Sequence, residues 1–194
     1  MSDTVELTGA AKNLRRAVFF AILALAAFLD LWSKSYAFEK LGPPGRGKYV
    51  DVVPGLRWET AENKGVAWGM LSDQNARWFI ASLSLIALPL IAGCFLRAKS
   101  PTWPFTLALS FIAGGTIGNL YDRVATGAVR DFIYVHCINF PVFNVADSFI
   151  CVGATLFALE HFIVGEKPKS PEPVAEGKPK PPEPAPESTP NEAK

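Results

Sequence analysis

Two aspartates, each within a largely apolar run, are the side chains of this sequence best suited to catalysis. Asp131 lies in the β-like run VRDFIYV, and Asp147 lies in FNVADSFI. Two carboxyls brought together in a partly dry site cannot both ionise cheaply, so they share a proton. One can then activate water while the other polarises a peptide carbonyl. A structural interpretation stays open, in which each aspartate separately caps a helix or pairs with Arg123 or Arg130.

The elements that must position these aspartates are predicted to be membrane-spanning helices. The chain has 194 residues, of which 49% are hydrophobic and only 19% are charged. Four apolar stretches approach the length of about 20 residues that crosses a hydrocarbon core of about 30 Å, and lipid requires such a backbone to bond internally as helix. The stretches cover about residues 17–34, 78–96, 103–120 and 141–164. We therefore predict an all-α membrane protein with four transmembrane helices, in one domain of residues 17–165.

The first apolar stretch also has an alternative interpretation as a cleaved signal peptide. Arg15 and Arg16 precede it, and residues 24–26 form an Ala-x-Ala triplet that resembles a cleavage site. The triplet lies inside the apolar run rather than after it, which favours the membrane-spanning helix.

Basic residues indicate the orientation of the four stretches. They precede the first, fill the short turn between the second and third, and follow the fourth, which are positions on one side of a four-span protein. Because basic residues are enriched on the cytoplasmic side, we predict that residues 1–16 and 166–194 are cytoplasmic. The second segment holds nine of the 16 prolines, alternating with Glu and Lys, which is typical of a disordered tail.

The segment between the first two stretches, residues 35–77, is predicted to carry a small β-sheet on the outer side. Residues 48–53, 55–60 and 65–70 are short β-rich runs separated by Pro-Gly and Asn-Lys-Gly turns. A sheet of two or three strands is marginal alone. We therefore expect it to lie over the outer ends of the helices and to lean on them.

In this topology the polar residues in or beside the apolar stretches gather at the outer helix ends. Ionisable groups at membrane depth cost several kcal/mol unless they are paired or face a polar cavity. Asp30 and Lys34 are expected to form an i, i+4 pair, and Arg123 to hold Asp122. A single polar site near the outer lipid boundary follows. The glycines of the third stretch, Gly114, Gly115 and Gly118, are expected to allow close helix contact.

Five ordered motifs within residues 17–164 resemble those of the lipoprotein signal peptidases, also called signal peptidase II. They are DLWSK (30–34), ENKGVAWG (62–69), GGTIGNLYDRV (114–124), VRDFI (129–133) and FNVADSFICVG (143–153). The resemblance implies a four-helix aspartic peptidase of the bacterial inner membrane with a periplasmic β-cradle and active site. Such an enzyme cleaves diacylglyceryl-modified prolipoproteins just before the lipidated lipobox cysteine.

The resemblance also implies roles for individual residues. It places the catalytic pair at Asp131 and Asp147, and it implies no cofactor and no metal. The expected partners are prolipoprotein substrates and membrane lipids, with the chain acting as a monomer. The supporting residues that the resemblance implies are Asn63, Asn119, Asp122, Arg123 and Asn144, with Asp30 and Lys34 at the exit of the first helix.

Other features of the sequence argue against competing functions. The formal net charge of +1 excludes a protein that coats nucleic acid, which needs a clustered basic face. His136 and Cys137 have no further metal ligand at suitable spacing, and Cys94 and Cys151 are expected to be buried thiols. A small transporter or proton-coupled channel also uses intramembrane Asp and Asn, but it needs polar groups through to the cytoplasmic side. A scaffold bundle would leave Asp147 without a purpose.

Overall fold

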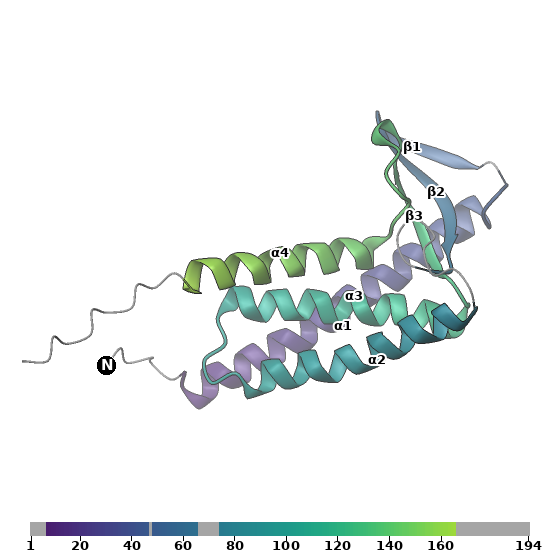
Figure 1. Ribbon diagram of the computed structural model, residues 1–194. Coiled ribbons are helices and arrows are strands. Elements are labelled where there is room, and N and C mark those ends of the chain that lie inside the picture. Colours follow the sequence, from purple (N-terminus) through teal and green to yellow (C-terminus); the bar gives the residue numbers. More distant parts are fainter. Residues whose placement is uncertain (1–6, 47, 66–73, 166–194) are drawn as a thin grey trace, which may run out of the picture.

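Four helices account for most of the protein. The computed structural model describes residues 7–46, 48–65 and 74–165. The helices are α1 (Gly9–Leu41), α2 (Gln74–Arg97), α3 (Trp103–Ala125) and α4 (Val145–Gly165). Figure 1 shows them bundled lengthwise, and α3 packs against each of the other three. The helical architecture predicted from the four apolar stretches is therefore confirmed, with α1 extending past residue 34 to Leu41.

Membrane insertion is supported for two of these helices by length and hydropathy. Within the described part of the chain, Arg77–Arg97 and Val145–Phe162 are long and apolar enough to cross a membrane. The prediction of four transmembrane helices is therefore not confirmed. Large apolar side chains nevertheless face outward along the helices. They include Phe20, Leu25 and Phe28 of α1, Leu83, Leu85 and Leu90 of α2, and Val152, Leu159 and Phe162 of α4.

Glycines let α3 approach its neighbours closely. A Cβ added at Gly114 would collide with the Leu23 carbonyl of α1, and one added at Gly115 would collide with the Ala146 carbonyl of α4. Gly118 faces the Asp30 carboxyl in the same way. The expected role of these glycines is thus confirmed, because small residues are what allow backbones to pack at such short range.

An apolar core fills the half of the bundle that lies away from the sheet. Phe19, Phe95, Leu109 and Ala113 are buried together where α1, α2 and α3 meet. The Phe19 and Phe95 rings stack with their centroids 4.2 Å apart. Aromatic stacking therefore packs α1 against α2 in this half of the bundle.

A three-stranded antiparallel sheet covers the opposite end of the bundle (Figure 1). Its strands are β1 (Tyr49–Val53), β2 (Leu56–Asn63) and β3 (Val129–Val135), in the order β1-β2-β3. The predicted runs 48–53 and 55–60 are therefore strands. The third strand of the sheet comes from residues 129–135. Most of the predicted run 65–70 lies outside the described residues, so that prediction stays untested.

The sheet rests on the extension of α1 beyond the bundle. The Trp58 ring of β2 meets the Tyr36 ring edge to face at 6.4 Å and the Phe132 ring at 5.8 Å. The Thr60 hydroxyl donates to the Gly42 carbonyl at 2.9 Å. A small sheet is marginal alone, and these contacts fix it, and with it Asp131 of β3, over the helix ends.

Candidate active site

Asp131 is delivered by the short connection between α3 and β3. After α3 ends at Ala125, the chain turns through Gly127, whose φ of 94° suits glycine, and enters β3 two residues before Asp131. Asp131 pairs across the sheet with Ala61 of β2 and is only 2% exposed. Asp131 is therefore a buried residue supplied by the sheet.

Asp147 lies in the first turn of α4, where it takes part in capping. The side-chain Oδ1 of Asn144 accepts a hydrogen bond from the Asp147 N–H at 2.9 Å, and the Asn144 N–H donates to Asp147 Oδ2 at 3.2 Å. This reciprocal pattern is a capping box, and a negative charge suits a helix N-terminus. The alternative that Asp147 caps a helix is therefore partly right, but only one of its oxygens is used in this way.

The segment before α4 brings Asn144 beside Asp131. Ile133 of β3 and Phe143 exchange backbone hydrogen bonds of 2.8 and 3.0 Å, which adds the residues before α4 to the edge of the sheet. As a result, Asn144 follows directly after this pairing and its side chain is fully buried. Its Nδ2 donates to Asp131 Oδ1 at 2.6 Å.

Two asparagine amides join the two carboxyls into one network. The Nδ2 of Asn144 also lies 3.1 Å from Asn119 Oδ1, and the Nδ2 of Asn119 donates to Asp147 Oδ1 at 2.8 Å. Asn119 comes from α3 and is 7% exposed. Residues of β3, α3 and α4 therefore meet at one point, with Asp131 and Asp147 both bonded to Asn144.

A buried ion cluster lies against this network. The Lys34 ammonium is 2.7 Å from Asp30 Oδ2 and 3.4 Å from Asp122 Oδ2, and the side chains of all three are fully buried. It also donates to Asn119 Oδ1 at 2.9 Å. The expected i, i+4 pair of Asp30 and Lys34 is thus present, and it is part of a larger cluster that reaches the site.

The expected partnership of Arg123 with Asp122 is wrong. Asp122 instead receives the Arg130 guanidinium at 2.7 and 3.1 Å, while Arg123 donates to the carbonyls of Asn119 and Gly65, both at 3.3 Å. Adjacent residues of a helix point to different faces, so Arg123 and Asp122 diverge. Arg123 therefore links α3 to the turn after β2.

The role of Arg130 was missed from the sequence, where it appeared only as a possible partner of the two candidate catalytic aspartates. Its eight-residue separation from Asp122 gives no local signal, because the pairing depends on the turn between α3 and β3. Asn63, at the end of β2, is a turn residue whose Oδ1 accepts from the Gly65 N–H at 3.0 Å. A hydrogen bond from the Asn63 side chain also lowers the pKa of the Asp131 carboxyl.

The electrostatic setting of Asp131 suits acid–base chemistry. Burial, together with the negative charge of Asp147, raises the pKa of Asp131 from 3.8 to about 7. Interactions with Asn144, Lys34 and Asn63 lower it and so limit the rise. A carboxyl that titrates near neutral pH can serve as a proton donor under physiological conditions.

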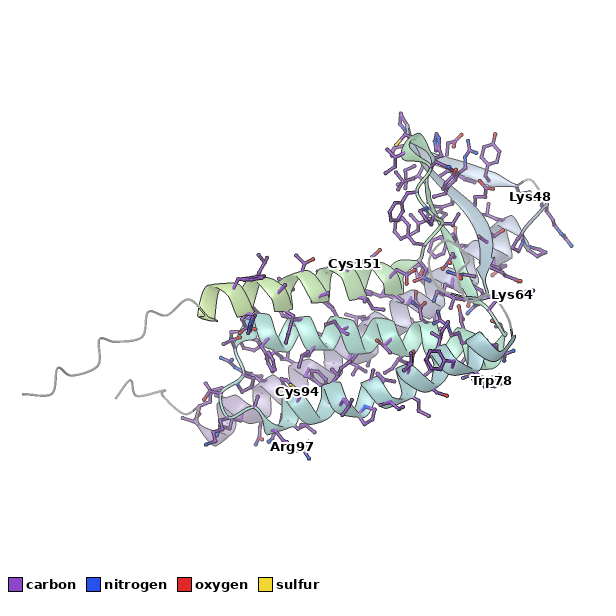
Figure 2. The ribbon with its side chains drawn as sticks, viewed as in Figure 1. Lys48, Lys64, Trp78, Cys94, Arg97 and Cys151 are labelled. Carbon is purple, nitrogen blue, oxygen red and sulfur yellow. The ribbon has the colours of Figure 1, made fainter. Side chains whose placement is uncertain are left out.

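The cysteines differ from expectation. Cys94 and Cys151 are exposed rather than buried; both are labelled in Figure 2, Cys94 along α2 and Cys151 along α4. They lie on outward faces of the helices, so apolar surroundings in the sequence did not mean burial inside the protein. Among the residues that the structure describes, no cluster of three or more His, Cys, Asp or Glu could hold a metal ion.

Comparisons with known proteins agree on one family. A family model described as signal peptidase (SPase) II matches residues 22–163. A lipoprotein signal peptidase of Pseudomonas aeruginosa is 38% identical over 148 residues, covering 73% of this chain and 85% of that protein. Another, of Acinetobacter baumannii, is 35% identical over 158 residues, covering 79% of this chain and 88% of that protein.

Solved structures show the same architecture. A bacterial membrane enzyme determined by the in meso method matches with a TM-score of 0.68 at 29% identity, covering 79% of this chain and 94% of that one. A second structure of a bacterial membrane enzyme gives a TM-score of 0.65 at 28% identity, with 79% and 95% covered. Residues 22–163, which the family model matches, include every polar residue of the candidate site.

Proposed function

Because the chain belongs to the signal peptidase II family, and is therefore a bacterial membrane peptidase that processes lipoprotein signal peptides, we propose that it is an aspartic endopeptidase. Asp131 and Asp147 are its catalytic pair. The observation that carries this proposal is the position of Asn144, which bonds to Asp131 through its amide and to Asp147 through its backbone N–H and its Oδ1.

The pair divides the chemistry between an acid and a base. The ionised carboxylate takes a proton from water as the water oxygen attacks the carbonyl carbon, and the protonated carboxyl donates its proton to the carbonyl oxygen. As the C–N bond breaks, the carboxyl that was protonated by water gives this proton to the departing amine. The other carboxylate takes a hydroxyl proton from the gem-diol intermediate, which forms the acid product and restores the starting protonation of the pair. The raised pKa of Asp131 favours it as the protonated member. Asn119 and Asn144 hold the two carboxyls in place without supplying a competing charge.

The proposed substrate is a diacylglyceryl-modified prolipoprotein, cut immediately before its lipidated cysteine. The acyl chains of such a substrate lie in the outer leaflet, so the bond to be cut lies near the outer lipid boundary. The site occupies the bundle end beside the sheet (Figure 1), and the outward apolar side chains of α1, α2 and α4 suit lipid contact. We place all four helices in the inner membrane, with both termini cytoplasmic and the sheet and site periplasmic.

This arrangement argues against a transport pathway. A transporter needs polar groups from one end of the bundle to the other, whereas stacked Phe19 and Phe95 fill the half away from the sheet. Residues 1–16 and 166–194 are proposed as cytoplasmic segments outside the peptidase domain, which we propose acts as a monomer.

A cleavage assay tests the proposal. The purified protein in detergent micelles is given a lipobox peptide with a diacylglyceryl cysteine, and the same peptide without the lipid as the matched control. Mass spectrometry should find a product that begins with the lipidated cysteine, and the control should remain intact. A product cut at another bond, or equal cleavage of both peptides, would overturn the substrate assignment.

A further inference from the structure

Two buried carboxylates outside the catalytic pair each hold the residue that precedes one of its members. Asp30 Oδ1 accepts a hydrogen bond from the Ala146 N–H at 2.8 Å, directly before Asp147. Asp122 Oδ2 accepts one from the Arg130 N–H at 2.9 Å, directly before Asp131. The two contacts tie the start of α4 to α1, and the start of β3 to α3. Each catalytic aspartate therefore has a backbone anchor on the helix bundle.

The Lys34 ammonium connects these two anchors. It contacts Asp30 Oδ2 at 2.7 Å and Asp122 Oδ2 at 3.4 Å. Its third contact is Asn119 Oδ1 at 2.9 Å. An ammonium has three donors and no acceptor, and here each of the three contacts is a group that holds part of the active site.

The contact with Lys34, together with that from the Asn144 amide, fixes the orientation of the Asn119 amide. An ammonium can only donate, so the oxygen of the Asn119 amide must lie toward Lys34. The Nδ2 is then directed at Asp147, to which it donates at 2.8 Å. Without the ammonium, the Asn119 oxygen would keep only the Asn144 amide as a donor, so Asn119 would be held less firmly against Asp147.

Among the described residues, Lys34 is the only cation that forms an ion pair with Asp30. Arg130 pairs with Asp122 and donates to the Ser35 hydroxyl, but it has no contact with Asp30. Loss of Lys34 would leave Asp30 without its ion pair and the anchors without a link. Two carboxylates that share one cation repel each other when it is removed, so the anchors would move apart.

We propose that Lys34 is a positioning residue that sets the separation of the catalytic carboxyls by joining the Asp30 and Asp122 anchors. The inference rests on the proposed function and deepens it. Lys34 forms no ion pair with Asp131 or Asp147 in the described structure. Its charge lowers the pKa of Asp131, while its effect on the separation of the two carboxyls depends on its contacts with the anchors and with Asn119. Misplacement of a reacting group by about 1 Å can cost about 10²-fold in rate.

Two variants test the proposal. Lys34→Met removes the ammonium but leaves Asp30 unpaired and buried, which endangers folding. The double variant Asp30→Asn with Lys34→Met balances the buried charge, and the Asn carbonyl can still accept from the Ala146 N–H. Lys40→Met is the matched control, because Lys40 lies on the same helix, is exposed, and rests over the Tyr36 ring 5.7 Å away.

The readouts are kcat and KM for the diacylglyceryl peptide, together with the thermal unfolding temperature in micelles. The double variant should unfold cooperatively, lose about 10²-fold in kcat, and keep KM within about threefold of wild type. Lys40→Met should match wild type. A folded double variant with nearly normal kcat, or with a loss confined to KM, would overturn the proposal, as would a double variant that no longer folds. Wild-type protein that fails to cleave would instead reject the proposed function.

Discussion

Replacing Asp131 by Asn should stabilise the folded protein at alkaline pH even as it removes activity. Asp131 is 2% exposed, and its pKa rises from 3.8 to about 7 on folding. Between these two values the folded protein keeps a proton that the unfolded chain has released. Folding is therefore favoured at low pH, and this contribution is lost as the pH rises through about 7. Asn has no proton to lose, so the stability of the Asp131→Asn variant does not follow this trend.

The size of the effect follows from the shift. One pKa unit corresponds to 1.36 kcal/mol, so the full penalty at pH 8 is at most about 4 kcal/mol. Between pH 5 and pH 8 the penalty grows by about 2.5 kcal/mol. For a domain of this length that change moves the unfolding temperature by about 5–10 °C.

Thermal unfolding in detergent micelles at pH 5 and pH 8 measures this difference directly. The unfolding temperature of Asp131→Asn minus that of wild type should be larger at pH 8 than at pH 5. A constant change in stability caused by the substitution itself would not alter this comparison. Asp51→Asn controls for the chemical change, because Asp51 lies on β1 with its side chain 55% exposed, and it should not reproduce the gain. An advantage that does not change with pH would refute the reasoning.

Three further predictions concern catalysis and packing. The kcat/KM for the lipidated peptide should fall as the pH rises above about 7, where Asp131 loses the proton that it donates; a profile flat to pH 9 would contradict this. Gly118→Ala should destabilise the protein by about 1–3 kcal/mol, because the methyl group would overlap the Asp30 carboxyl, while Gly9→Ala, with nothing within 4 Å, should lower the unfolding temperature far less. A chain ending at Gly165 should cleave at the wild-type rate, since the site is built from residues before it; lost activity would show that the remaining residues take part.

Much of the fold and of the residue set could be predicted from local patterns. Apolar length indicated the helices, and the alternation in VRDFIYV indicated a strand. The spacing of Asp30 and Lys34 predicted their pairing, since residues four apart share a helix face. Local sequence carries these features because each depends on a neighbour within a turn or two.

The features that could not be predicted depend on contacts between distant segments. β2 pairs with a strand about 70 positions later in the chain, and no pattern in either strand identifies the strand with which it pairs. The choice of Arg130 over Arg123 by Asp122 depends on a turn that redirects the chain. The prediction that Cys94 and Cys151 are buried is wrong, because an apolar sequence does not distinguish a helix face that contacts protein from one that contacts lipid.

The most direct test of the catalytic pair is single-turnover cleavage of the diacylglyceryl lipobox peptide by Asp131→Asn and Asp147→Asn, each compared with Asp51→Asn. Each of the first two variants should remain folded and inserted and should lose about 10³-fold or more in rate, because it removes an acid or a base. Asp51→Asn should retain the wild-type rate. Near-normal cleavage by either Asp131→Asn or Asp147→Asn would contradict the assignment.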